Sequence, residues 1–289
     1  MDRRQFVKGL GLGLSALATG SGWVPELGAE PLRMPIGLIV YTVRDDCARD
    51  LEGTLSRVAE VGYKEVEMYS PFFDRKASET RRILNADGLV CPSAHWTVAV
   101  TESEWKKQVE YAGEVGLKFL VSGIPFSKPL TLDDYRRGAE ILNKAGEQCR
   151  KAGLELAYHN HHFEFQTFDG VVAYDELLRR TDPKLVKMEL DCFWVTFAGK
   201  DPVEYFKRYP GRFALLHIKD LKPGHEPSTE KVEGQPFTEV GRGIINWRQI
   251  FAAARQGGLK HYFVEQDVCD RPPLESVKIS YEYLKNLKV

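Results

Sequence analysis

The segment AGLELAYHN, residues 152–160, carries the pattern from which the fold can be predicted. Gly153 follows a helical stretch, and glycine takes the left-handed conformation that ends a helix without steric cost. The run after it is short and rich in Leu, Ala and Tyr, as expected for a strand that is buried on both faces. The segment therefore predicts the end of a helix followed at once by a buried strand.

The same unit, a glycine followed by an apolar run, occurs four more times along the chain. The further copies are VGYKEVEMY (61–69), DGLVCPSAH (87–95), VGLKFLVSG (115–123) and GGLKHYFVE (257–265). Three more strands are predicted in IGLIVY (36–41), LVKMELD (185–191) and RFALLHIKD (212–220). Helical stretches separate these runs, so the chain predicts an α/β protein with an all-parallel sheet. No GxGxxG turn follows the first strand, which favours closure into a (βα)8 TIM barrel over an open sheet.

Composition and charge limit the classes of partner. The chain has 289 residues, a formal net charge of -1 and 28% charged residues. This balance lacks the basic surface that binds nucleic acid or an anionic membrane. The five cysteines are scattered and form no CxxC pair, so they are interpreted as mostly structural thiols. We therefore expect a small-molecule partner and no nucleic acid, and a homo-oligomer is compatible with the sequence.

The first 29 residues predict an export signal rather than part of the fold. The pair Arg3 and Arg4 precedes Phe6 and a glycine-rich, weakly apolar run that is too short to span a membrane. This pattern resembles a twin-arginine signal, with cleavage expected after Ala29, and it predicts a periplasmic protein. The alternative is a disordered, mildly basic N-terminus. Residues 30–289 are predicted to form one barrel domain.

Ionisable residues collect at the ends of the predicted strands. In a TIM barrel these ends and the loops after them form the active site. A random scatter of charges would not sort itself in this way, so the strand ends predict a functional site. The residues found there are Tyr41, Glu67, His95, the segment 159–164, Asp191, His217, Lys219 and Glu265.

Three of these residues predict a metal site. Asp191, His217 and Glu265 close the sixth, seventh and eighth predicted strands, which are neighbours in a barrel. One imidazole and two carboxylates suit a single divalent ion such as Mn²⁺, Mg²⁺, Co²⁺ or Zn²⁺. The alternative is a hydrogen-bonded polar plug at the mouth of the barrel.

Four segments in the second half of the chain carry a resemblance to a known family. They are MELDCFWVTFAGKDPVEYF (188–206), RFALLHIKD (212–220), EVGRGIINW (239–247) and YFVEQD (262–267). Together they resemble the sugar phosphate isomerase/epimerase superfamily, the xylose isomerase-like TIM barrels, from about Pro35 onward. The resemblance implies one metal ion held by residues after strands five to eight. Asp191, His217 and Glu265 match the last three of these ligands.

The first ligand implied by the resemblance, a glutamate after strand five, has no direct counterpart. Its position falls on His161, and the nearest carboxylate is Glu164. Glu164 is the favoured fourth ligand, since a hard divalent ion readily takes another carboxylate oxygen, and His161 is the alternative. His159 shares a strand face with His161 and is a candidate acid or base.

Further residues are expected to contact the substrate or to take part in catalysis. Where the resemblance implies a substrate-binding histidine, this chain has Trp194, which would either stack on a sugar ring or pack in the core. Lys219 is expected to stabilise an oxyanion or to carry a proton. Glu67, His95 and Asn160 are expected to bind substrate.

These parts predict enolisation of a keto-sugar. A divalent ion that chelates a carbonyl and an adjacent hydroxyl acidifies the carbon-bound hydrogen between them. His161, His159 or Glu265 could then transfer that proton. The asymmetry introduced by His161 favours elimination or hydration, and the resemblance includes a branch that acts on 3-keto-glycosides. Export implies an unphosphorylated sugar. The alternatives are a simple ketose isomerase or epimerase and a non-catalytic sugar-binding barrel.

Overall fold

The computed structural model describes residues 33–98, 102–126 and 130–289, and at its centre eight parallel strands form a closed barrel. The strands are β1 (Gly37–Ile39), β2 (Glu65–Tyr69), β3 (Val90–His95), β4 (Phe119–Ser122), β5 (Glu155–His159), β8 (Val186–Asp191), β9 (Phe213–Ile218) and β12 (His261–Val264). Each barrel strand pairs with the next one along the chain, and β12 pairs with β1, where Phe263 lies opposite Gly37. The predicted barrel is confirmed.

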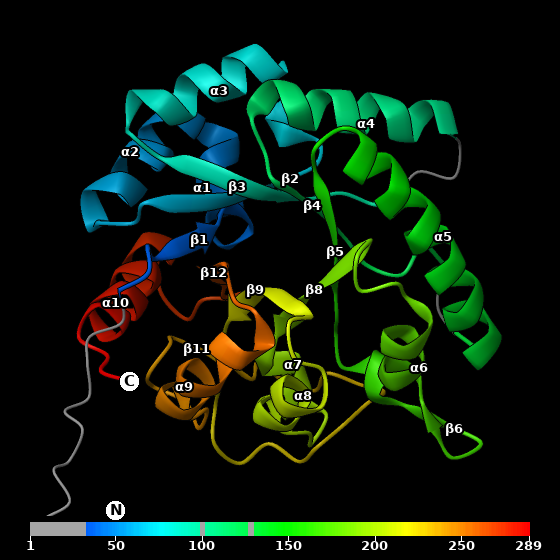
Figure 1. Cartoon of the computed structure of the whole chain (residues 1–289). Coiled ribbons are helices and arrows are strands. Elements are labelled where there is room, and N and C mark those ends of the chain that lie inside the picture. Colours follow the sequence, from blue (N-terminus) through cyan, green and yellow to red (C-terminus); the bar gives the residue numbers. More distant parts are fainter. Residues whose placement is uncertain (1–32, 99–101, 127–129) are drawn as a thin grey trace, which may run out of the picture.

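Helices cover the outside of the barrel (Figure 1). They are α1 (Arg44–Arg49), α2 (Leu51–Val61), α3 (Ala77–Ala86), α4 (Glu102–Val115), α5 (Leu132–Lys151), α6 (Ala173–Arg180), α7 (Cys192–Phe197), α8 (Pro202–Arg208), α9 (Trp247–Gly257) and α10 (Pro273–Lys285). The last helix, α10, packs against α2 and so joins the two ends of the barrel domain. Gly153 has φ +77° and Gly258 has φ +95°, which confirms the left-handed helix ends predicted from the repeat.

The inside of the barrel changes from apolar to ionisable along the strands. Leu215 on β9 and Phe263 on β12 belong to a small buried apolar cluster. Two residues further on, and therefore on the same strand faces, come His217 and Glu265. The apolar layer thus closes the bottom of the barrel, and the ionisable layer lies directly above it, at the ends where the loops begin.

Short elements follow several strands. Three 3-10 helices follow β1, β2 and β5: η1 (Val40–Val43), η2 (Phe72–Asp74) and η3 (Phe163–Phe165). Two small antiparallel pairs join β6 (Thr167–Phe168) to β7 (Val171–Val172) and β10 (Asp220–Leu221) to β11 (Phe237–Thr238).

The predicted export signal, residues 1–29, lies outside the described residues. Among the helices that the structure describes, none has the length and apolar character needed to cross a membrane.

Candidate metal centre and active site

A cavity of about 350 Å³ opens at the carboxyl ends of the strands. His95 and His159 reach it from the ends of β3 and β5, and His161 and Glu265 reach it from the segments that follow β5 and β12. The cavity thus brings together four residues that the sequence predicted for the site. Tyr41, Tyr69, Trp96 and Asp267 also contribute to its wall.

Asp191, His217 and Glu265, here called the triad, lie together as predicted. His217 Nδ1 is 2.9 Å from Glu265 Oε2 and 3.9 Å from Asp191 Oδ2. The ligand atoms of all three lie within 4.8 Å of one another, and all three side chains are buried. One imidazole and two carboxylates from neighbouring strands are therefore arranged so that they can hold a divalent ion.

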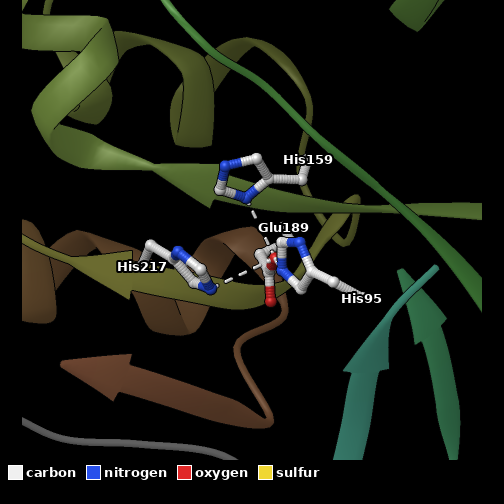
Figure 2. Close-up of side chains that lie close together, drawn as sticks. All are labelled: His95, His159, Glu189 and His217. Carbon is white, nitrogen blue, oxygen red and sulfur yellow. Dashed lines mark hydrogen bonds and ion pairs between the residues drawn. The ribbon is translucent and has the colours of Figure 1, made fainter. Parts of the chain in front are cut away.

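A second group of possible ligands lies beside the triad, centred on Glu189 (Figure 2). Glu189 Oε2 is 2.8 Å from His95 Nε2 and 3.0 Å from His159 Nδ1. His217 Nε2 is 3.3 Å from the same oxygen. Three imidazoles from β3, β5 and β9 therefore converge on a single buried carboxylate that belongs to β8.

Glu67 connects the two groups. Its Oε2 atom lies 2.7 Å from His217 Nε2 and 3.1 Å from His95 Nε2. Glu67 Oε1 and Glu189 Oε1 are buried and have no hydrogen-bond partner among the described residues. A buried carboxylate oxygen without a partner is costly in free energy, and a bound cation would satisfy it. This observation supports metal binding at this end of the barrel.

Burial and neighbouring charges shift the protonation of these groups. Burial, reinforced by the negative charge of Glu67, raises the pKa of Glu189 to about 7. Burial also raises the pKa of Asp191 to about 6, although Lys219 opposes this shift. For His95, burial lowers the pKa, but the charges of Glu67 and Glu189 outweigh it and raise the pKa to about 10. The cluster therefore holds protons near neutral pH that a metal ion would have to displace.

Lys219 is a buried cation next to the triad. Its Nζ atom is 3.2 Å from Asp191 Oδ2, 2.7 Å from Glu265 Oε2 and 2.7 Å from Asp267 Oδ2. The same ammonium lies 4.9 Å from the ring centre of Trp194. Burial lowers the pKa of Lys219, but the carboxylates outweigh it and hold the pKa well above its ordinary value. Lys219 is therefore charged at neutral pH, which suits electrostatic stabilisation rather than proton donation.

Glu164, the favoured fourth ligand from the sequence, is directed elsewhere. Its carboxylate accepts hydrogen bonds of 2.8 Å from the Tyr158 hydroxyl and 2.8 Å from the His161 backbone N–H. Tyr158 points away from the barrel interior because it alternates with His159 along β5. Among the described residues, the candidate ligand groups contain Glu189 and not Glu164. The geometry therefore places Glu189, and not Glu164, among the possible metal ligands.

Three residues expected to bind substrate do not line the cavity in the described part of the chain. Asn160 is buried, and its Oδ1 accepts a 3.1 Å hydrogen bond from the Asp191 backbone N–H, so it holds β5 against β8. Trp194 is 6% exposed and packs against His162 and Phe193, which favours core packing over sugar stacking. Glu67 is fully buried beneath the histidines that do reach the cavity.

Sequence reasoning missed Glu189. The signal was present, because Glu189 precedes Asp191 by two residues and therefore faces the same side of β8. Asp267 was also missed; it follows Glu265 by two residues and lies beyond the end of β12. For β8 only the residue at the very end of the strand was considered, although alternation brings a second carboxylate to the same face.

Comparison with known proteins identifies the family to which this barrel belongs. Residues 55–287 match the family model described as the xylose isomerase-like TIM barrel, and the chain belongs to this family. An inosose dehydratase of Lacticaseibacillus casei is 23% identical over 305 residues, covering 94% of this chain and 95% of that protein. A sugar phosphate isomerase/epimerase structure from Parabacteroides distasonis is 28% identical, with a TM-score of 0.75, and covers 93% of this chain and 97% of its own.

A more distant structure, the IOLI protein with a bound zinc atom, has a TM-score of 0.71 and 15% identity. It covers 87% of this chain and 98% of that one. At this identity the likeness shows a shared fold.

Proposed function

We propose that this protein is a divalent-metal-dependent enzyme that enolises an unphosphorylated keto-sugar, with dehydration or another elimination as its reaction. The observation that carries this proposal is the triad of Asp191, His217 and Glu265, whose member Glu265 lines the same cavity as His161. The similarity to inosose dehydratases along nearly the whole chain supports a lyase that acts on a keto-sugar.

The triad is the proposed metal site, with His217 as a ligand through Nδ1. When bound, a divalent ion supplies Lewis-acid polarisation of a carbonyl oxygen, which acidifies the hydrogen on the adjacent carbon. Glu67 Oε2, 2.7 Å from His217 Nε2, orients the imidazole and fixes which nitrogen faces the other two ligands. The unpartnered oxygens of Glu67 and Glu189 support the binding of a cation at this end of the barrel.

His161 is the proposed proton carrier. It lines the cavity and stacks on Phe163, with ring centres 5.4 Å apart, which holds the imidazole plane in place. A positioned imidazole contributes about 10² to 10⁴ in rate as a general acid or base. Lys219 lies 2.7 Å from Glu265 Oε2, where its charge would stabilise negative charge that develops on the substrate.

The residues that line the cavity also indicate the charge of the substrate. Among the described residues that line it, none is Lys or Arg, and the polar wall consists of imidazoles, hydroxyls and carboxylates. A phosphate group is usually held by Arg, Lys or a helix N-terminus. This wall therefore supports a neutral sugar rather than a sugar phosphate.

A simple isomerase or epimerase is the second candidate. It is favoured by the similarity to the Parabacteroides distasonis sugar phosphate isomerase/epimerase structure. Both candidates begin with removal of the same hydrogen and differ in whether a group leaves from the neighbouring carbon.

The test is hydrogen exchange in heavy water. The metal-loaded protein, incubated with inososes, 3-keto-glycosides and free ketoses, should exchange the hydrogen next to the carbonyl, followed by nuclear magnetic resonance. Glu265→Gln should reduce the exchange by about 10² to 10⁴. Glu65→Gln is the matched control, because Glu65 pairs with His261 near the start of β12, at the other end of the barrel. Exchange with only an epimer as product would select the second candidate, and no exchange with any substrate would reject both.

A further inference from the structure

The second group of possible ligands beside the triad contains His95, His159 and Glu189, together with His217, which it shares with the triad. His217 Nδ1 faces the triad, and Glu67 Oε2 lies 3.1 Å from His95 Nε2, so Glu67 takes the fourth place here. Glu67, His95, His159 and Glu189 come from four different barrel strands and are called the two-histidine cluster below. The proposed reaction uses the triad, His161 and Lys219, and it gives Glu67 only the task of orienting His217, so these four residues have no direct role in it. Figure 2 shows His95 and His159 directed at Glu189 from different sides.

The spacing of the donor atoms fits a common metal ion. Zinc lies about 2.0 to 2.1 Å from histidine nitrogens and about 2.0 to 2.2 Å from carboxylate oxygens, so in a tetrahedral site neighbouring ligand atoms are about 3.3 to 3.5 Å apart. In the structure, His95 Nε2 is 2.8 Å from Glu189 Oε2, and His159 Nδ1 is 3.0 Å from it. These atoms would have to move apart by about half an ångström for an ion to lie between them.

The charge and the burial of the cluster also favour a bound cation. Two carboxylates and two imidazoles are gathered where Glu67 and Glu189 are both 0% exposed. Each carboxylate has one oxygen, Oε1, with no hydrogen-bond partner among the described residues. Buried carboxylates need a cation or a full set of donors, and the neighbouring histidines reach only the Oε2 atoms.

We propose that the two-histidine cluster is a second divalent-cation site, separate from the triad. Two imidazole nitrogens and two carboxylate oxygens favour Zn²⁺, Co²⁺ or Mn²⁺ over Mg²⁺ or Ca²⁺, which prefer oxygen ligands only. His95 and His159 also line the cavity, so an ion held here faces the same space as Glu265 of the triad.

Both sites can be filled at once because His217 presents a different nitrogen to each. Its Nδ1 faces the triad, 2.9 Å from Glu265 Oε2, while its Nε2 lies 2.7 Å from Glu67 Oε2. Glu67 can therefore accept the Nε2 hydrogen through Oε2 and offer Oε1 to the second ion. No ligand atom has to serve two ions.

The test is the number of ions bound per chain. The full-length protein is loaded with Co²⁺ or Zn²⁺, freed of excess ion and analysed by plasma mass spectrometry. The expected count is about two ions, falling to about one in His95→Ala and in Glu189→Gln. The double variant Asp191→Asn, Glu265→Gln should also retain about one ion. His261→Ala is the matched control, since His261 also pairs with a glutamate, Glu65, at the far end of β12, and it should retain both ions.

Each possible number of bound ions either supports or contradicts the second site. One ion in the unaltered protein, kept by both His95→Ala and Glu189→Gln, overturns the second site and leaves the proposed function intact. One ion that depends on His95 and not on Asp191 supports the two-histidine cluster and rejects the triad as metal site. Circular dichroism and thermal melting show whether each variant is folded, and the visible spectrum of bound Co²⁺ should change in Glu189→Gln.

Discussion

Glu67 Oε2 lies 2.7 Å from His217 Nε2, although 150 positions separate the two residues in the chain. Both side chains are completely buried. The contact joins β2 to β9, which are not neighbours in the barrel, so it crosses the barrel interior. It leaves His217 Nδ1 directed at Glu265, the arrangement needed for a metal ligand whose second nitrogen is held by a carboxylate.

Replacing Glu67 by Gln should weaken metal binding at the triad without removing a ligand of that site. The amide no longer holds His217 Nε2 as a charged acceptor, so affinity should fall by about 10 to 100-fold. Titration calorimetry with Mn²⁺ in a chain that also carries His95→Ala measures the triad alone. Glu65→Gln, which removes the equivalent carboxylate from His261, is the control and should leave the affinity unchanged. Equal affinity in all the chains would contradict the orienting role of Glu67.

Lys219→Met should destabilise the metal-free protein strongly. The change leaves Asp191, Glu265 and Asp267 without their shared cation, and loss of one partner from a buried ion pair costs about 3 to 5 kcal/mol. A divalent ion should restore much of this loss because it neutralises the triad. Urea unfolding with and without Mn²⁺ measures both effects. The control is Lys222→Met, whose partner Asp270 is exposed and whose loss should cost no more than about 1 kcal/mol. Similar losses in the two variants would count against a buried charge cluster.

Metal affinity should already be reduced at pH 8 by the proton on His95, whose pKa is about 10, and it should fall more steeply below about pH 7. Burial raises the pKa of Glu189 to about 7 and that of Asp191 to about 6, so below these values the folded protein holds protons at the sites. An ion must displace them, and each displaced proton lowers affinity by about tenfold per pH unit. Calorimetry from pH 8 to pH 5, in buffers of different ionisation enthalpy, measures the affinity and counts the released protons. A constant affinity over this range would show that the carboxylates are already ionised.

Export through residues 1–29 is a separate proposal that rests on the sequence alone. Replacing Arg3 and Arg4 by Lys should keep the protein in the cytoplasm, since the arginine pair is the recognised feature of such signals. Fractionation with an antibody against the barrel domain measures its location. Lys8→Arg, which retains the pair, is the control and should be exported normally. Unchanged secretion of the double variant would contradict the proposal.

The repeated glycine and apolar run was enough to predict the barrel, because both signals are local. Gly153 ends its helix through its own conformational freedom, and the strand after it is recognised by apolar residues that need no knowledge of their neighbours. The position of Asp191, His217 and Glu265 was predictable for a related reason. Parallel strands bring their carboxyl ends to one rim, so residues that end three successive strands must lie close together.

The sequence could not decide which further carboxylate lies among the possible ligands. Glu164 is only three residues from His161 in the chain, yet the turn of η3 directs it to Tyr158 on the outside of the barrel. Glu189 lies within a strand whose sequence does not distinguish it as a functional residue. Only the folded barrel brings His95 and His159, which belong to other strands, next to it. Alternation along a strand assigns a side chain to a face, but the stagger between strands sets its height in the barrel. The height of each side chain depends on the closed sheet as a whole, and it decides which residues come into contact. The tertiary structure therefore placed Glu67 and Glu189 among the histidines.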